Sequence, residues 1–321
     1  MSGAPVRIRN VSVAYPGADR RAVDDVSLDV AGGELIVLLG PSGCGKSTLL
    51  RTINCLVVPD AGSIEVDGKD VREATPEALR RGIGYVIQAV GLFPHMSVGK
   101  NIGLVPELLG WDRPRIDARV DELLRLVQLD PERYRARLPR ELSGGEQQRV
   151  GVARAIAAEP RVLLMDEPFG AVDAIVRAAL QAETLRIHEA LGTTIFFVTH
   201  DVDEALRVAG RIVVMNAGKI VQADTPLHVL ARPASPYVEE LLDTKDAVRR
   251  LGVMLVRDAM APLDGAPTQG RIAADRNLRE ALSLFLEGND RLAVADPANG
   301  HVTGTLAFGD VRRAVASAQD A

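Results

Sequence analysis

The sequence predicts an α/β fold built on a largely parallel sheet. The segments "GIGYVIQ", "RVLLMD" and "TTIFFVTH" are dense in apolar and β-branched residues, as expected of strands buried on both faces. Residues 172–191, between the last two, have the pattern of a helix, so strand, helix and strand alternate. The apolar run "ELIVLLG" leads directly into the glycine-rich stretch "GPSGCGKSTLL", residues 40–50. These observations predict a parallel sheet with a glycine-rich loop at one edge.

The glycine-rich stretch matches G-x-x-x-x-G-K-[ST] between a strand and a helix, as that phosphate-binding motif requires. Inward-facing backbone N–H groups and the helix N-terminus would hold the phosphates of a nucleotide. We expect Lys46 to reach the β- and γ-phosphates and Ser47 to ligate Mg²⁺. The alternative is a glycine-rich turn with a chance lysine. The predicted nucleotide-binding loop comprises Gly40, Pro41, Ser42, Gly43, Cys44, Gly45, Lys46, Ser47 and Thr48.

The remaining segments indicate how the chain is divided. Alternating apolar and polar residues in "VRIRNVSVAY", "VDDVSLDV" and "GSIEVDGKDV" predict an antiparallel layer. Helical spacing through residues 97–160 predicts a helical insert in the α/β core. The composition changes after "PASPYVEELL". We therefore expect a nucleotide-binding domain over 1–240, a linker over 241–252 and a small α+β domain over 253–321.

Composition limits the classes of function. The 321 residues carry a net charge of −5, and no basic cluster indicates a nucleic-acid partner, although ordinary solubility explains that charge equally well. No run of about 18 apolar residues occurs, so we expect no segment that crosses a membrane by itself. The two cysteines, Cys44 and Cys55, are placed on one predicted helix. They indicate a reducing cytosol rather than a disulfide framework.

A second catalytic element is "RVLLMDEP", residues 161–168, an apolar strand with two acids at its carboxyl end. Beyond the strand end both carboxylates can turn toward the phosphates. We expect Asp166 to hold Mg²⁺ through water and Glu167 to polarise the attacking water as general base. An exposed acidic turn is the alternative for both residues.

The stretch "LSGGEQQRV", residues 142–150, places Ser143, Gly144 and Gly145 at the start of a helix. Such a helix start is another anion-binding end. Since one protomer already has its phosphate loop, a second phosphate site indicates a second protomer.

Six motifs in this order resemble those of the nucleotide-binding subunits of ABC transporters. They are Tyr15, the phosphate loop, Gln88, "LSGGEQQRV", "LLMDEP" with Asp173 in "GAVDAIVR", and His200 in "FVTHD". The resemblance covers roughly residues 6–240. It implies a homodimer that binds ATP and Mg²⁺ and hydrolyses ATP.

The resemblance also implies individual roles. Tyr15 would stack on adenine, where the alternative is a packed strand-end aromatic. Gln88 would contact Mg²⁺ or the lytic water and report the nucleotide state to a membrane partner. His200 would hydrogen-bond the γ-phosphate, although a lone histidine is more often structural. Asp173 would cross the dimer interface, and its "AVD" context departs conservatively from the usual "ALD".

Within the family, residues 83–102 and 105–134 resemble importers of quaternary-amine osmoprotectants such as glycine betaine, choline and carnitine. This implies a peripheral subunit on the cytoplasmic face of the inner membrane. It would bind an integral permease and act indirectly with an extracytoplasmic solute-binding protein. The alternative is an ABC ATPase of repair or translation that has no permease. Such proteins usually carry two cassettes or a long coiled-coil insert.

The tail resembles one CBS motif, a β-α-β-β-α unit that commonly occurs in tandem. The matching segments are "VRDAMAP", "NLREALSLFLEGNDRLAVAD" and "GHVTGTLAFGDVRRAV". A lone unit implies pairing between protomers. Ala307, ahead of Asp310, occupies the position where nucleotide-binding CBS units often carry Ser or Thr. Adenosine binding and a purely dimerising role both remain open.

Overall fold

The computed structural model describes residues 3–88, 91–170, 174–263, 265 and 267–320. The chain divides into two compact units. The first comprises Met1–Asp201 with Val213–Ile220, and the second comprises Val202–Ile212 with Val221–Ala321. Among the described residues, no helix is long and apolar enough to cross a membrane.

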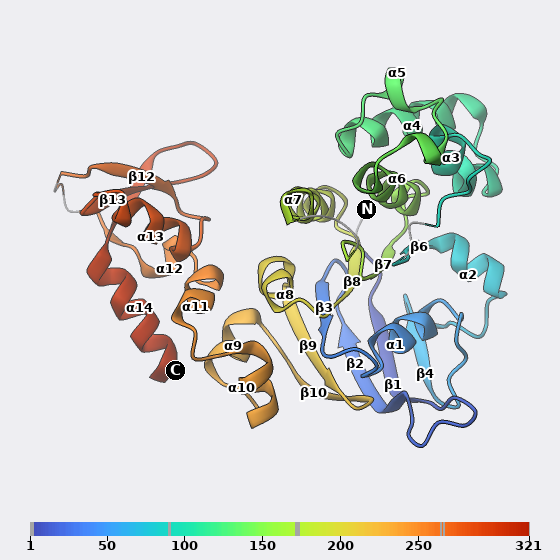
Figure 1. Ribbon diagram of the computed structural model, residues 1–321, viewed down its shortest axis with the longest axis horizontal. Helices are drawn as coiled ribbons and strands as arrows, with labels where there is room; N and C mark the ends of the chain where they lie inside the picture. Colours follow the sequence, from blue (N-terminus) through green and yellow to red (C-terminus); the bar gives the residue numbers. More distant parts are fainter. Residues whose placement is uncertain (1–2, 89–90, 171–173, 264, 266, 321) are drawn as a thin grey trace. The chain divides into compact units, whose positions relative to one another are not determined.

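The main sheet has six strands in the order β10-β9-β3-β8-β7-β6 (Figure 1). The pairs β3/β8, β7/β8 and β6/β7 are parallel, and every residue of β3, β7 and β8 is buried. This confirms the parallel sheet that the sequence predicts. Its strands are β3 (Leu35–Leu39), β6 (Ile83–Val86), β7 (Val162–Asp166), β8 (Thr194–Thr199), β9 (Arg211–Asn216) and β10 (Lys219–Asp224).

A second sheet of four strands has the order β2-β1-β4-β5. Each neighbouring pair is antiparallel, which confirms the predicted antiparallel layer. Alternate residues of β2 point into a core shared with the parallel sheet, which is why this strand alternates in sequence. The strands are β1 (Val6–Val13), β2 (Val23–Val30), β4 (Ala61–Val66) and β5 (Lys69–Asp70).

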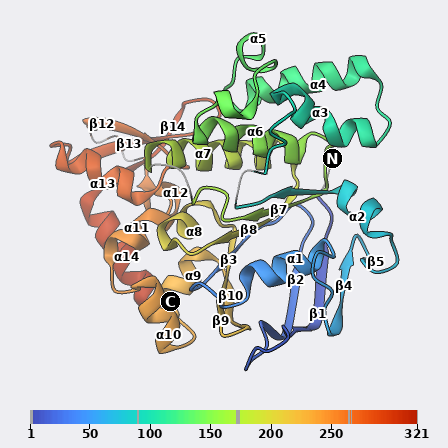
Figure 2. The same cartoon turned by 45° about the vertical axis from the view of Figure 1, so that its right-hand side comes forward.

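The predicted helical insert is confirmed, with four α-helices and a 3₁₀ turn that lie together in green in Figure 2. Ser97, Asp112 and Ser143 cap three of these helices with their side chains, which fixes where each begins. The elements are α3 (Val98–Leu108), α4 (Arg113–Leu126), α5 (Pro131–Tyr134), η1 (Pro139–Glu141) and α6 (Gly144–Ile156). The other helices of the first unit are α1 (Lys46–Ile53), α2 (Pro76–Gly82) and α7 (Ala174–Leu191).

The two cysteines do not share a helix, so that expectation is wrong. Cys44 lies in the loop before α1, and Cys55 follows the C-cap residue Asn54 with a φ of 54°. Helix α1 is only eight residues long because the backbone leaves helical geometry at Asn54. Both cysteines are free thiols.

The second unit contains a four-stranded sheet in the order β11-β14-β13-β12. Its core includes Leu251, Val256, Leu278 and Leu292, so side chains of α11 contribute to it from within the segment predicted as a linker. The strands are β11 (Ala261–Pro262), β12 (Gly270–Ala273), β13 (Arg291–Ala295) and β14 (Val302–Ala307). The helices are α8 (Val202–Val208), α9 (Pro226–Ala231), α10 (Pro236–Leu242), α11 (Ala247–Val253), α12 (Val256–Ala259), α13 (Leu278–Leu286) and α14 (Phe308–Asp320).

Candidate nucleotide site

The glycine-rich loop joins β3 to α1 and is shaped by glycines that no other residue can replace without strain. Gly45 has a φ of 108°, and a Cβ atom there would lie 2.1 Å from the carbonyl oxygen of Ala22. Gly43 also has a positive φ, of 77°, but a Cβ atom there would meet nothing within 4 Å. The loop therefore depends on glycine at Gly45 for space and at Gly43 for backbone conformation alone.

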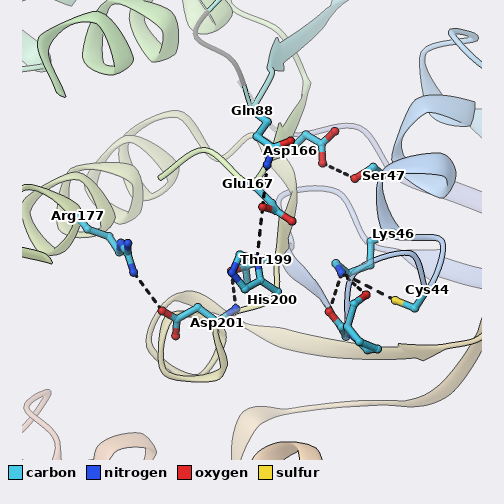
Figure 3. A network of polar contacts seen from close by, with 12 residues as sticks. Cys44, Lys46, Ser47, Gln88, Asp166, Glu167, Arg177, Thr199, His200 and Asp201 are labelled. Carbon is cyan, nitrogen blue, oxygen red and sulfur yellow. Dashed lines mark hydrogen bonds and ion pairs between the residues drawn. The ribbon is translucent and has the colours of Figure 1, made fainter. Parts of the chain in front are cut away.

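Lys46 is folded into this loop. Its Nζ donates to the carbonyl oxygens of Gly40 at 2.6 Å and Pro41 at 2.9 Å, and lies 3.9 Å from the Sγ atom of Cys44 (Figure 3). The side chain is only 4% exposed. Its ammonium group is thus held inside the loop. The oxygens of a bound phosphate would replace the two carbonyl oxygens as acceptors of its hydrogen bonds.

Asp166, at the carboxyl end of β7, meets the first turn of α1. The Ser47 hydroxyl donates to its Oδ1 at 2.7 Å (Figure 3). The Arg51 guanidinium donates to its Oδ2 at 3.2 Å. The Asp166 side chain is almost fully buried, so Arg51 supplies the charge that a buried carboxylate requires. A hydrogen bond that Arg51 donates to Tyr85 is the main cause that raises the pKa of Arg51, and Asp166 acts in the same direction.

The donor set fits Mg²⁺. This ion in nucleotide sites takes one or two protein oxygens together with phosphate oxygens and water. Ser47 and Asp166 bring a hydroxyl and a carboxylate oxygen together at the phosphate loop. No group of three or more His, Cys, Asp or Glu side chains able to hold a metal occurs in the described ranges.

Glu167 contacts two other residues that the sequence places in the site. Its Oε2 accepts a hydrogen bond from Gln88 Nε2 at 3.1 Å and lies 3.4 Å from His200 Nδ1 (Figure 3). The residue has a φ of 44°, uncommon for any residue except glycine, and its N–H donates to the carbonyl of Val198 at 3.0 Å. Backbone strain of this kind is found at functional sites. The structure thus gathers Gln88, Glu167 and His200 where β6, β7 and β8 end.

The remaining predicted site residues are Tyr15, Ser143 with its two glycines, and Asp173. Tyr15 follows β1, is 44% exposed, and its OH lies 3.4 Å from Thr48 Oγ1. Ser143 is the exposed N-cap of α6 and is followed by Gly144 and Gly145. Asp173 falls outside the described residues.

Cys44 is 3% exposed, whereas Cys55 is partly exposed. The predicted loop therefore contains a cysteine that packs inward rather than facing a ligand.

Sequence reasoning missed two supporting contacts. Arg51 lies one helical turn after Ser47 on α1 and holds the same carboxylate, and although this spacing is visible in the sequence, it does not identify Asp166 as the shared partner. Arg177 on α7 pairs with Asp201, the neighbour of His200, at 3.3 Å (Figure 3). No local pattern indicates this second pair because it joins elements that are adjacent only in the folded chain.

The chain is similar to known proteins over most of its length. The model of the family described as ABC transporter matches residues 23–170. The glycine betaine/carnitine/choline transport ATP-binding protein of Bacillus subtilis (strain 168) is 46% identical over 301 residues, which cover 92% of this chain and 76% of that protein. The chain belongs to the ABC transporter family. It is an ABC-type ATPase.

Further relatives of this ABC ATPase come from other bacteria. The glycine betaine uptake system ATP-binding protein of Escherichia coli (strain K12) is 47% identical over 91% of this chain and 94% of that protein. A sulfate/thiosulfate import ATP-binding protein of Pseudomonas aeruginosa is 43% identical over 92% of each.

A solved structure extends the comparison to the fold. It is an ATP-binding cassette described as the dimeric post-hydrolysis state bound to ADP and Pi. It matches with a TM-score of 0.63 and 31% identity, covering 69% of this chain and 98% of that one. The ATPase fold predicted from sequence is confirmed.

Proposed function

We propose that this ABC ATPase works as a homodimer that closes on Mg-ATP and reopens after hydrolysis, and so drives an importer. The observation that carries the proposal is the position of Glu167, whose Oε2 faces both Gln88 and His200 beside the phosphate loop. A carboxylate held in this way can accept a proton from an attacking water.

Each remaining residue has a defined task in this proposal. Lys46 and the loop N–H groups bind the β- and γ-phosphates, and Tyr15 stacks on adenine. Ser47 and Asp166 hold Mg²⁺, which neutralises developing phosphate charge when bound. Gln88 and His200 orient the water and the γ-phosphate around Glu167.

The other half of each site comes from the partner protomer. Ser143, Gly144 and Gly145 stand at the exposed start of α6, where helix N–H groups and the helix dipole favour a phosphate. The chain has its own phosphate loop, so we assign these residues to the nucleotide of the second protomer. Asp173 would cross the same interface. The dimeric state of the matched cassette structure supports this assignment.

We further propose that the cargo is a quaternary amine of the glycine betaine, choline and carnitine class. Relatives named for these solutes align with more than nine-tenths of the chain. The subunit would act at the cytoplasmic face of the inner membrane, bound to a permease near the segment that follows Gln88. An extracytoplasmic solute-binding protein would deliver the solute. A relative named for sulfate/thiosulfate import provides the second candidate cargo.

Uptake assays distinguish these cargoes. The ATPase is assembled with a candidate permease and solute-binding protein, and uptake of labelled glycine betaine and of labelled sulfate is measured in vesicles containing ATP. We expect ATP-dependent glycine betaine uptake, competition by choline or carnitine, and no sulfate uptake. Sulfate uptake would identify the other class of importer, and absence of any permease that co-purifies would contradict a transport function.

The tail is proposed to be a CBS unit that pairs between protomers. Its order β12-α13-β13-β14-α14 is that of the motif. Phe308 and Leu286 are 47% and 81% exposed, and a second copy would cover them. Asp310 already accepts the Ala307 N–H at 2.8 Å and pairs with Arg313, which favours pairing over adenosine binding. Replacing Leu286 and Phe308 by Ser should abolish any nucleotide-independent dimer, and unchanged sedimentation would contradict the pairing.

A further inference from the structure

Ser143, Gly144 and Gly145, which we call the signature loop, lie at the start of α6. A reciprocal pair of hydrogen bonds holds this loop. Ser143 Oγ accepts the Glu146 N–H at 3.3 Å, and Glu146 Oε2 accepts the Ser143 N–H at 2.7 Å. This capping box uses one lone pair of the Ser143 hydroxyl and leaves its hydrogen free to donate outward. The N–H groups of Gly144 and Gly145 have no partner within the helix because they belong to its first turn.

The second carboxylate oxygen of Glu146 is fixed from another element. The Tyr134 hydroxyl, at the end of α5, donates to Glu146 Oε1 at 2.6 Å. Each oxygen of the carboxylate therefore has its own donor, and the group cannot rotate without breaking one of the two bonds. The Tyr134 hydrogen bond is the main cause that lowers the pKa of Glu146, and the same bond raises the pKa of Tyr134.

The peptide that carries Tyr134 is itself anchored. The Arg137 guanidinium lies 4.8 Å from the centroid of the Tyr134 ring. The carbonyl oxygens of Arg135 and Arg137 accept the N–H groups of Gly99 and Val98 at 2.9 and 2.8 Å. Tyr134 is thus tied to the start of α3 on one side and to the signature loop on the other.

We propose that Tyr134 is a positioning residue for the signature loop, acting through Glu146 to hold Ser143 in the orientation that binds the nucleotide of the partner protomer. The inference rests on the proposed function, in which Ser143 contacts that nucleotide. Tyr134 touches no nucleotide itself. Its removal should therefore affect closure of the ATP-bound dimer and leave nucleotide binding by one protomer unchanged.

The test is made in a Glu167→Gln background that also carries Leu286→Ser and Phe308→Ser, so that ATP rather than the tail holds the dimer together. Tyr134→Phe removes only the hydroxyl. Loss of a hydrogen bond to a charged group should raise the protein concentration needed for half-dimerisation in Mg-ATP by about tenfold or more. Monomer affinity for Mg-ATP, measured below that concentration, should stay at the parental value. Tyr237→Phe, which removes a hydroxyl in the second unit, serves as the matched control.

A double-substitution cycle separates positioning from a general loss of structure. Glu146→Ala removes the acceptor, and adding Tyr134→Phe to it should then weaken dimerisation no further. Two results would overturn the inference. One is that Tyr134→Phe dimerises like the parental protein, and the other is that Tyr134→Phe weakens dimerisation of the Glu146→Ala variant as much as it weakens dimerisation of the protein that retains Glu146. Ser143→Arg tests the underlying function separately: if it leaves the dimer intact, the proposed role of the signature loop is wrong irrespective of Tyr134.

Discussion

Gln88 and Glu167, 79 residues apart in the sequence, are joined by a hydrogen bond of 3.1 Å between Nε2 and Oε2. The bond links the end of β6 to the residue directly after β7. Because the same oxygen also faces His200, displacement of the Gln88 segment would alter the environment of the carboxylate assigned to water activation. If a permease binds near Gln88 as proposed, this bond gives a physical route by which it can influence hydrolysis.

Replacing loop glycines should affect stability unequally. Gly43→Ala places a left-handed alanine in open space, so we expect a loss of about 1–2 kcal/mol. Gly45→Ala adds a clash with the Ala22 carbonyl, so its loss should be larger, about 3 kcal/mol. Denaturant unfolding without nucleotide measures both. Equal losses would show that the backbone at Gly45 moves freely and would contradict the loop geometry.

The two thiols should differ in their reactivity toward alkylating reagents. Cys44 is 3% exposed and should react with an alkylating reagent only on unfolding. Cys55 is partly exposed, but burial raises the pKa of its thiol. The rate at which Cys55 is labelled should be low at neutral pH. As long as the pH stays below that pKa, the rate should increase about tenfold for each unit by which the pH is raised. Rapid labelling of Cys44 in the folded protein, measured by mass spectrometry of peptides, would contradict this packing.

Sequence patterns predicted those parts of the fold and site that depend on local order. The strand ending at Asp166, the helix starting after Ser143 and the loop around Lys46 each have a local signature of apolar runs, caps and glycines. The contacts of Arg51 with Asp166 and of Tyr134 with Glu146 have none, because tertiary packing brings those side chains together. The end of α1 was misplaced because Asn54 and Cys55 leave helical geometry without a glycine or proline to mark the change.

Removing the tail should leave nucleotide binding largely intact. Every predicted catalytic residue precedes Val202, whereas Leu251 on α11 belongs to the tail core, so the cut is best made after Lys245. The shortened chain should bind Mg-ATP within about twofold of the parental affinity, a change of less than 0.5 kcal/mol. Loss of ATP binding on truncation would contradict a separable tail.

The central claim is that Glu167 activates water in a site completed by a second protomer. Glu167→Gln keeps the size of the side chain and an oxygen that can accept from Gln88, but removes the base. Hydrolysis should fall by about 10²- to 10⁴-fold, while Glu65→Gln, on β4, should hydrolyse ATP at the parental rate. The most direct measurement is size-exclusion chromatography of Glu167→Gln with Mg-ATP in a chain that also carries Leu286→Ser and Phe308→Ser, so that pairing through the tail does not hide the ATP-dependent dimer. The account predicts an ATP-bound dimer that Ser143→Arg dissolves, and a Glu167→Gln protein that stays monomeric at high concentration would contradict it.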